Sequence, residues 1–339
     1  MPPRSFFVDP SNREHLAVAR NFSQDSQALA FEFIQKRNLP YIVGDTELAA
    51  YIGISPALIR QICHNKKFHY RIFQIPRKNG PDRVVHAPRT YLKVIQWWIL
   101  DNILSRVEVH PAAFGFVRDR DYVENARFHV GSRHVLNVDI ERFFPNINLE
   151  MISGVFESLG YSHEASAFLA DLSSIDDQAP TGAPTSPMLG NLVLRELDAE
   201  LHNFATENDF KYSRYADDIT ISSGSFIDEE VLAFVSAAVA RYGFNLNLDK
   251  TKFMGKGDRM EVTGLTINEK VNASKDWRNS ARGFLNRVRH NPREFVERFD
   301  VVAGVYGTLC SIDPDHETKL TVLARRALDA LKECEAPAD

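Results

Sequence analysis

The sequence predicts an α+β fold, because strand-like and helix-like segments alternate without the regular strand–helix–strand rhythm of a doubly wound sheet. The 339 residues are enough for one to three domains with a sizeable core. Their composition, 44% hydrophobic and 25% charged, is typical of a globular chain and excludes wholesale disorder.

Alternating residues and turn sequences indicate the strands, and apolar residues at helical spacing indicate the helices. The strands are expected, in order, at 71–75, 83–87, 134–140, 211–215, 219–222 and, as a pair, within 261–267. The helices are expected at 21–39, as two short ones in 45–62, at 90–104, as two between 140 and 178, as a long one through 189–201, at 228–242, and as two or three in 277–332. The pair in 45–62 resembles a helix-turn-helix, but a structural pair without a DNA-reading role is favoured.

Several classes of protein are excluded by what the sequence lacks. Its longest apolar runs fall far short of the ~20 residues needed to cross a bilayer. The first residues have no apolar stretch of signal-peptide length. The scattered Cys63, Cys310 and Cys334 suit neither a disulfide framework nor a metal cluster. A cytoplasmic protein without membrane contact is therefore expected.

The net charge of −5 hides an uneven distribution. Residues 60–93 carry nine basic residues and one acid, whereas 150–230 carry three basic residues and sixteen acids. Basic character returns in 275–298, with seven basic residues against three acids. Two positive surfaces around an acidic middle would suit a polyanion held near metal ions, although ordinary solvated faces explain the pattern equally well.

Three acidic residues are the candidates for chemistry. Asp139 ends a predicted strand, and Asp217 and Asp218 lie at the tip of a predicted hairpin. In neighbouring antiparallel strands these carboxylates would repel one another unless cations neutralised them, and all-oxygen ligands favour Mg²⁺ or Mn²⁺. The alternative is that the Asp-Asp pair only shapes a turn.

The sequence around these residues resembles the reverse transcriptases, most closely the bacterial retron group. The resemblance covers about residues 70–268, and its most specific blocks are those around Asp139 and YADD. The blocks occur in the order IPRKNGPDRVVHAPRTYLKVIQ, AFGF, VLNVDIERFFPNI, TGAPTSPMLGNL, YADDITIS, FNLNLDKTKF and VTGLTIN. Within the superfamily, NARFH (125–129) and Val262-Thr263-Gly264 are similar to elements of the retron group.

The resemblance implies a right-hand polymerase with fingers, an antiparallel palm sheet and a helical C-terminal thumb. The expected division is an N-terminal helical extension at 1–40, fingers at 41–133, a palm at 134–268 and an RNA-binding thumb at 269–339. Helices around 148–180 are expected to contribute to the fingers. By this division no RNase H, maturase or endonuclease domain follows the thumb.

The resemblance also assigns the metal ligands. Asp139 and Asp217 would be the principal ligands of two Mg²⁺ ions, for which Mn²⁺ could substitute, with Asp218 close by. The Ile140 carbonyl would be a main-chain ligand. Phe144 would lie beneath the incoming sugar and leave no room for a 2′-OH, whereas Phe143 is expected in the core.

Other residues would bind the nucleotide. Lys78 and Arg83 in the basic fingers hairpin would hold the triphosphate, with Arg77 a near-equal candidate for the role of Lys78. Gly182 would allow close approach of the backbone. Its neighbour Thr181 departs from the family's usual Gln, which puts its binding role in doubt. Lys250 would protonate pyrophosphate, or it is an inert surface lysine.

RNA contacts are expected in two places. Asn125 and His129 would share a helix face and contact RNA, or they form a structural pair. Arg278, Arg282 and Arg289 would form a basic stripe that follows a phosphate backbone.

The function implied by the resemblance is that of an RNA-directed DNA polymerase that copies part of a cognate structured non-coding RNA (msr-msd) into branched multicopy single-stranded DNA (msDNA). It would use dNTPs, prime from an internal guanosine 2′-OH, depend on host RNase H and act with a separate effector protein in anti-phage defence. The alternatives are a group II intron or diversity-generating reverse transcriptase, and a non-catalytic RNA-binding protein on a polymerase fold.

Overall fold

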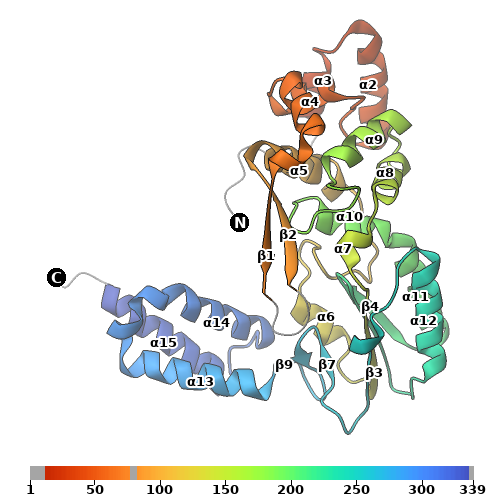
Figure 1. Ribbon diagram of the computed structural model, residues 1–339. Helices are drawn as coiled ribbons and strands as arrows, with labels where there is room; N and C mark the ends of the chain where they lie inside the picture. The colour runs from red at the N-terminus through yellow and green to blue at the C-terminus, as the bar shows by residue number, and fades with distance from the viewer. Residues whose placement is uncertain (1–11, 77–81, 336–339) are drawn as a thin grey trace.

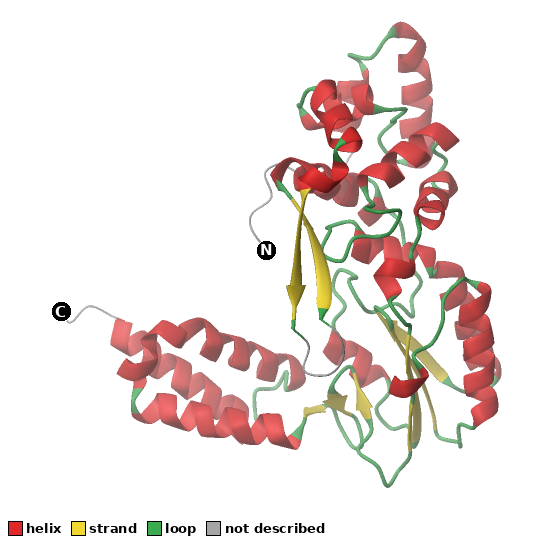
Figure 2. Cartoon of the chain, viewed as in Figure 1, coloured by secondary structure: helices red, strands yellow, loops and turns green. Residues whose placement is uncertain are grey.

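The computed structural model describes residues 12–76 and 82–335 (Figures 1 and 2). It confirms the α+β prediction, because antiparallel sheets are combined with many helices that do not alternate regularly with strands. A four-stranded sheet in the order β4-β5-β3-β6 lies at the centre. Its strands are β3 (His134–Asp139), β4 (Lys211–Tyr215), β5 (Asp218–Ser223) and β6 (Lys252–Met254).

The N-terminal helical region forms the upper part of Figure 1. Its helices are α1 (Arg13–Ala19), α2 (Gln24–Arg37), α3 (Asp45–Ile52), α4 (Pro56–His64), the 3-10 helix η1 (Lys66–His69), α5 (Thr90–Asn102) and η2 (Leu104–Arg106). The expected helix over 21–39 is shorter than predicted and follows a separate α1. Helices α8 (Leu149–Ser158) and α9 (His163–Leu172) pack against each other beside this region. The helices in this part of the molecule therefore come from chain segments before and after β3.

A two-stranded hairpin of β1 (Tyr70–Ile75) and β2 (Arg83–Pro88) extends from the helical region toward the lower part of the molecule in Figure 1. Its register pairs Tyr70 with Pro88 and Ile75 with Arg83. Tyr70 is buried, but the rest of β1 is exposed, including the apolar side chains Ile72 and Phe73. A hairpin so little covered by the protein offers its surface to other molecules.

Helices cover the central sheet and connect it to the N-terminal region. They are α6 (Tyr122–Phe128), α7 (Phe143–Asn146), α10 (Ser186–Val193), α11 (Arg195–Glu207), α12 (Glu229–Arg241) and the 3-10 helix η3 (Leu248–Lys250). Helices α11 and α12 lie side by side, and α11 packs on β4. The single long helix expected through 189–201 is wrong, since the chain turns at Leu194 between α10 and α11. The turn allows α10 to contact α7 while α11 lies along the sheet.

A smaller sheet and a helical bundle complete the chain. The predicted strand pair is present as β7 (Glu261–Val262) and β8 (Leu265–Thr266), joined by a third short strand, β9 (Asn272–Ala273). The C-terminal bundle then consists of α13 (Lys275–His290), the 3-10 helix η4 (Pro292–Arg298), α14 (Phe299–Ile312) and α15 (Lys319–Glu335). Figure 1 shows it projecting to one side of the sheets.

The buried apolar residues explain this arrangement. One continuous core joins the N-terminal helices to the central sheet, running from Leu39 to Leu246. The C-terminal bundle has its own core around Leu285, Val302 and Leu331. A third core under β7–β9 includes Val123 of α6, and Trp277 and Ile312 of the bundle pack against it. Among the described residues, no helix is both long and apolar enough to span a membrane.

Candidate active site at the end of β3

The acidic residues predicted to converge do lie together. In the antiparallel pairing of β3 with β5, Asp139 is the register partner of Asp218. The Ile140 backbone N–H donates to the Asp217 carbonyl over 2.9 Å. Asp218 is not part of the hairpin tip, as the sequence suggested, but the first residue of β5. The connecting turn is therefore only Ala216-Asp217, which brings Asp217 directly beside the end of β3.

A third segment closes the site on the other side of β3. The Asn247 N–H donates to the Asp139 carbonyl over 2.8 Å, and the Glu141 N–H donates to the Asn245 carbonyl over 2.8 Å. These bonds hold the FNLNLDKTKF block against the strand end. The Ile140 carbonyl lies between them and accepts no hydrogen bond from the described residues. It is thus available as a main-chain ligand.

The electrostatics of the site are those of crowded carboxylates. Desolvation by the surrounding protein and, after it, the charges of Asp217 and Asp139 together raise the pKa of Asp218 to about 7, although its side chain still reaches solvent. Desolvation, followed by the charge of Asp139, also raises the pKa of Asp217. The site therefore has an excess of negative charge that a bound cation would relieve.

Lys250 meets part of that charge. Its Nζ donates to Asp139 Oδ1 over 2.7 Å, with half of the lysine side chain exposed. This contact places Lys250 at the acidic cluster, which distinguishes it from a solvated surface lysine.

The donor set fits a hard divalent cation. Carboxylates at Asp139, Asp217 and Asp218 and a main-chain carbonyl are the oxygen ligands that Mg²⁺ prefers. With Lys250 on Asp139, however, the described His, Cys, Asp and Glu residues contain no group of three arranged to hold an ion as they stand.

A buried arginine holds the turn that carries Asp217. Arg214 is fully buried, and its Nη1 donates to the Ala216 carbonyl over 2.8 Å. Its Nε and Nη2 donate to the two oxygens of the buried Asp198 over 2.8 and 2.6 Å. The Tyr212 hydroxyl also donates to Asp198, over 2.6 Å. This network fixes the backbone of the turn, in which Ala216 has a φ of +59°.

The AFGF loop packs directly on the same turn. A Cβ at Gly115 would lie 2.4 Å from the Ala216 nitrogen, so only glycine fits. Asn191 joins the two parts, because its Nδ2 donates to the Gly115 carbonyl over 2.8 Å and its Oδ1 accepts from Arg214 Nη1 over 3.1 Å. Sequence reasoning did not assign roles to Gly115, Asn191, Asp198 or Arg214. The signals that could have indicated their role in supporting the Asp217 turn were the glycine of AFGF and the arginine three residues before Asp217.

The two phenylalanines after Asp139 differ in environment. Phe143 is buried as expected and packs on α10, where a Cβ at Gly190 would meet its ring at 2.8 Å. Phe144 is only partly buried, and its ring centroid lies 6.3 Å from that of the exposed Phe116 in AFGF. An aromatic surface thus lies beside the acidic cluster.

The expected nucleotide-binding residues are found on the β1–β2 hairpin and the loop beside it. Arg83 begins β2 and is close enough to Asp217 to lower the pKa of that carboxyl against the raising effects. The Thr181 carbonyl accepts from the His86 N–H over 2.8 Å. Gly182 has a φ of +114°, and a Cβ there would approach Val85 to 2.9 Å. Lys78 and its alternative Arg77 lie outside the described residues.

Asn125 and His129 are buried, with 1% and 0% of their surfaces exposed. The His129 ring bridges two strands, at 2.7 Å from Ser213 Oγ on β4 and 2.7 Å from Ser222 Oγ on β5. Burial leaves neither side chain a surface for RNA, and the hydrogen bonds of His129 support its structural alternative, whereas Asn125 Nδ2 and Oδ1 have no hydrogen-bond partner among the described residues. The VTG turn contacts the start of α6, since Thr263 Oγ1 donates to the Tyr122 carbonyl over 2.7 Å.

The arginines of α13 are accessible. Arg282 and Arg289 are exposed and Arg278 is partly exposed. Their spacing of four and seven residues gives them one helix face. They are remote in the chain from the acidic cluster and belong to a different surface, at the bundle.

Comparison with known proteins identifies the family of this chain. Residues 75–267 match the family described as reverse transcriptase (RNA-dependent DNA polymerase). The Retron Ec86 reverse transcriptase of Escherichia coli is 30% identical, over 86% of this chain and 92% of its own length. The Retron Mx65 and Mx162 reverse transcriptases of Myxococcus xanthus are 33% and 30% identical, over 75% and 88% of this chain and 65% and 71% of theirs.

Among solved structures, the apo telomerase of Candida tropicalis, truncated from its C-terminal domain, is similar with a TM-score of 0.44. The identity is 12%, over 62% of this chain and 55% of that chain, and our assignment does not depend on it. The family match and the retron relatives carry the conclusion. This chain belongs to the reverse transcriptase family, within it to the retron reverse transcriptases, and is an RNA-directed DNA polymerase.

Proposed function

We propose that this protein synthesises msDNA from a cognate structured non-coding RNA by nucleotidyl transfer at the acidic cluster. The observation that supports the proposal best is the pairing of Asp139 with Asp218 beside Asp217. Asp139, Asp217 and Asp218 are the proposed catalytic residues and, with the Ile140 carbonyl, the proposed ligands of two Mg²⁺ ions. When bound, such ions activate an attacking hydroxyl and stabilise a leaving pyrophosphate, and Mn²⁺ can substitute.

The chain's own residues would position the substrates. Arg83 and Lys78 would hold the triphosphate of a dNTP. Phe144 would exclude a 2′-OH beneath the sugar. The backbone of Thr181-Gly182 would approach the nucleotide or the template. Lys250 would leave Asp139 when a metal binds and donate a proton to pyrophosphate, for which its 2.7 Å contact is a starting point.

The structure's regions would then correspond to the parts of a right hand. We assign residues 1–40 to an N-terminal extension, 41–133 with the helices around 148–180 to the fingers, 134–268 to the palm and 269–339 to the thumb. The separate core of the bundle supports a distinct thumb, whereas one continuous core joins the proposed fingers and palm. The template and primer would lie between the β1–β2 hairpin and the bundle.

The biological role is part of the same proposal. The RNA would be an msr-msd transcript, primed from the 2′-OH of an internal guanosine, with host RNase H removing RNA after copying. A separate effector protein would act with the resulting msDNA in anti-phage defence in the cytoplasm. The similarity to retron reverse transcriptases is the ground on which this role is proposed.

The test is primer extension on an RNA template with dNTPs and Mg²⁺. The Asp217→Asn, Asp218→Asn double variant should lose extension by at least about a thousandfold. It removes two proposed ligands of the metal ions that would stabilise the charge developing in the transition state. Equal extension by both proteins would remove the assignment of the acidic cluster. Nucleic acid that co-purifies from cells should contain a 2′-5′ branch; linear products alone would contradict the priming step.

A further inference from the structure

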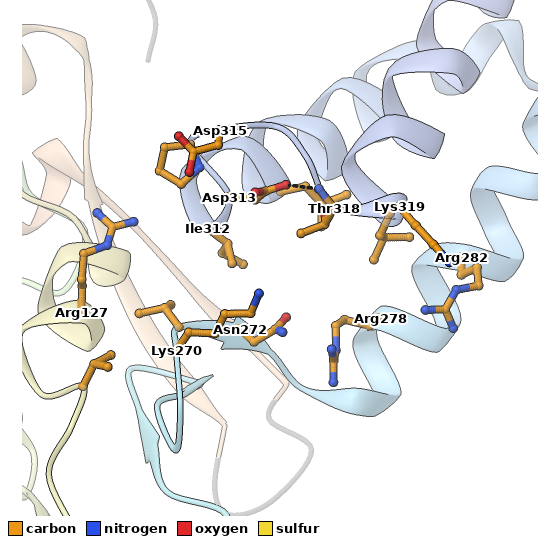
Figure 3. Close-up of a pocket in the computed structure, with 15 residues that line it drawn as sticks. Arg127, Lys270, Asn272, Arg278, Arg282, Ile312, Asp313, Asp315, Thr318 and Lys319 are labelled. Atoms are coloured by element: carbon orange, nitrogen blue, oxygen red, sulfur yellow. Dashed lines mark hydrogen bonds between the residues drawn. The ribbon is translucent and has the colours of Figure 1, made fainter.

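A second ligand site lies at the junction of the sheets with the C-terminal bundle. A cavity of about 470 Å³ is formed by α6, the β8–β9 hairpin, α13 and the connection from α14 to α15 (Figure 3). Its lining comes from segments almost 200 residues apart, as Arg127 of α6 and Lys319 of α15 illustrate. It is separate from the acidic cluster, because Asp139, Asp217 and Asp218 are not among its lining residues.

The cavity has an excess of unpaired positive charge. Its basic lining residues are Arg127, Lys270, Arg278, Arg282 and Lys319. None of the five forms an ion pair with a described residue, although Asp313 and Asp315 line the same cavity. Asp313 is already engaged, since it accepts from the Thr318 N–H over 2.9 Å and from Thr321 Oγ1 over 2.7 Å. The cations thus have no carboxylate partner among the described residues, although Arg127 donates to the Ser311 carbonyl and Arg282 to Asn279 Oδ1.

Arg278 gives an independent indication of a ligand. Its Nε is buried and has no hydrogen-bond partner among the described residues. Burying a charged donor without a partner is costly, and an anion in the cavity would remove that cost. A solvated basic face, by contrast, would leave this atom in water.

Apolar residues form another part of the lining. Val271, Leu309 and Leu320 are buried, and Val130 and Ile312 are partly exposed. A volume of about 470 Å³ is in the range of small-molecule sites. Inorganic phosphate would leave this apolar surface unused, whereas a nucleotide has both a phosphate for the cations and a flat base for the apolar side.

We propose that this cavity binds one unpaired nucleotide of the RNA partner, with its phosphate on Arg278, Arg282 and Lys319 and its base against Ile312 and Val271. The inference rests on the proposed function for the presence of an RNA partner. Unpaired bases are the part of RNA that proteins hold in this manner. The bound nucleotide would contact both the sheet region and the bundle, which Arg127 already links by donating to the Ser311 carbonyl over 3.3 Å.

The test uses the full chain and a fluorescent single-stranded oligoribonucleotide of about 12 residues, within the site size of such proteins. The Lys270→Glu, Lys319→Glu variant reverses two cavity charges. The control, Lys256→Glu, Lys332→Glu, makes the same change in net charge at exposed lysines outside the cavity. Affinity should fall about tenfold more in the cavity variant than in the control, with a shallower salt dependence.

A second measurement locates the base. An oligoribonucleotide containing 4-thiouridine should crosslink to peptides within 270–272 or 309–320, and the cavity variant should lose these crosslinks. Equal affinity losses in the cavity variant and the control would overturn the inference, as would competition by polyglutamate as effective as that by unlabelled RNA. Free nucleoside monophosphate that displaced the oligonucleotide crosslink at equal concentration would show a free-nucleotide site and overturn it too.

Failure of the proposed function can be recognised separately. Extension of an oligo(dT) primer on poly(rA) by the unmodified protein tests the acidic cluster with a simple duplex. Loss of extension in the unmodified protein would contradict the proposed function, whereas retained extension without the crosslinks would contradict only the cavity.

Discussion

Arg214 donates a hydrogen bond from its buried guanidinium to the carbonyl of Ala216, the residue immediately before Asp217. The same guanidinium is held by both oxygens of Asp198, so a buried ion pair sets the backbone of the turn that carries Asp217. The position of Asp217 in the acidic cluster therefore depends on residues outside the cluster.

Asp198→Asn should reduce both stability and activity. Removing one partner of a buried ion pair leaves the other charge uncompensated and costs ~3–5 kcal/mol. Urea unfolding should show this loss, and primer extension of the folded fraction should also be slower because the turn shifts. The matched control is Glu200→Gln, which breaks the exposed pair with Arg241 and should cost less than ~1 kcal/mol. Similar losses for the two variants would be evidence against the role of Arg214.

Gly115→Ala should slow nucleotide incorporation more than it destabilises the fold. The added Cβ would lie 2.4 Å from the Ala216 nitrogen, so either the AFGF loop or the Asp217 turn must move. We expect kcat for primer extension to fall by about 10- to 100-fold, since a displacement of about 1 Å at a reacting group has effects of that order. Gly154→Ala in α8 is the control, because no atom lies within 4 Å of its added Cβ and helix propensity improves. Unchanged kcat in Gly115→Ala would show that the turn tolerates displacement.

Phe144→Ala should admit ribonucleotides. The side chain is partly exposed beside the acidic cluster, where removal of the ring would leave space for a 2′-OH. The ratio of kcat/KM for dNTP to that for the matching rNTP should fall by at least about tenfold, as for a lost contact of ~1.4 kcal/mol. Phe143→Leu, in the core, should lower stability without changing this ratio. An unchanged ratio in Phe144→Ala would assign that ring to packing.

Stability should fall below pH 6.5 because of His129. Burial lowers the pKa of its imidazole to about 3, from an ordinary value of 6.5. The unfolded chain therefore takes up a proton before the folded one does, and stability is lost as the pH falls from 6.5 toward 3. This group alone should contribute a loss of ~2 kcal/mol between pH 7 and pH 5.

Urea unfolding at pH 7 and pH 5 measures that loss. His129→Asn should be less stable at pH 7, since it gives up contacts with Ser213 and Ser222, but its stability should depend less on pH. An identical pH dependence in the two proteins would mean that His129 does not titrate as a buried group.

The sequence was sufficient for the class of fold and the identity of the acidic residues. Local signals carried this information: a strand ending in Asp139, a short hairpin with Asp217, and apolar residues at helical spacing. Where the pattern of apolar residues was a weak indicator, the predicted helix boundaries were wrong. Leu194 has the apolar character of its helix, yet the chain turns there because α10 and α11 must contact different partners.

Tertiary structure alone decided how the acidic cluster is supported. Nothing in the local sequence pairs Arg214 with Asp198 or places Gly115 on Ala216, because these contacts join segments that are distant in the chain. It also decided that His129 is buried, because the spacing of His129 from Asn125 in the sequence does not reveal whether that helix face packs against the protein or faces solvent. The cavity at Arg278 and Lys319 likewise exists only where the bundle meets the sheets. Residue types and spacing determine which chemistry is available, whereas burial and long-range contacts determine which side chains can perform it.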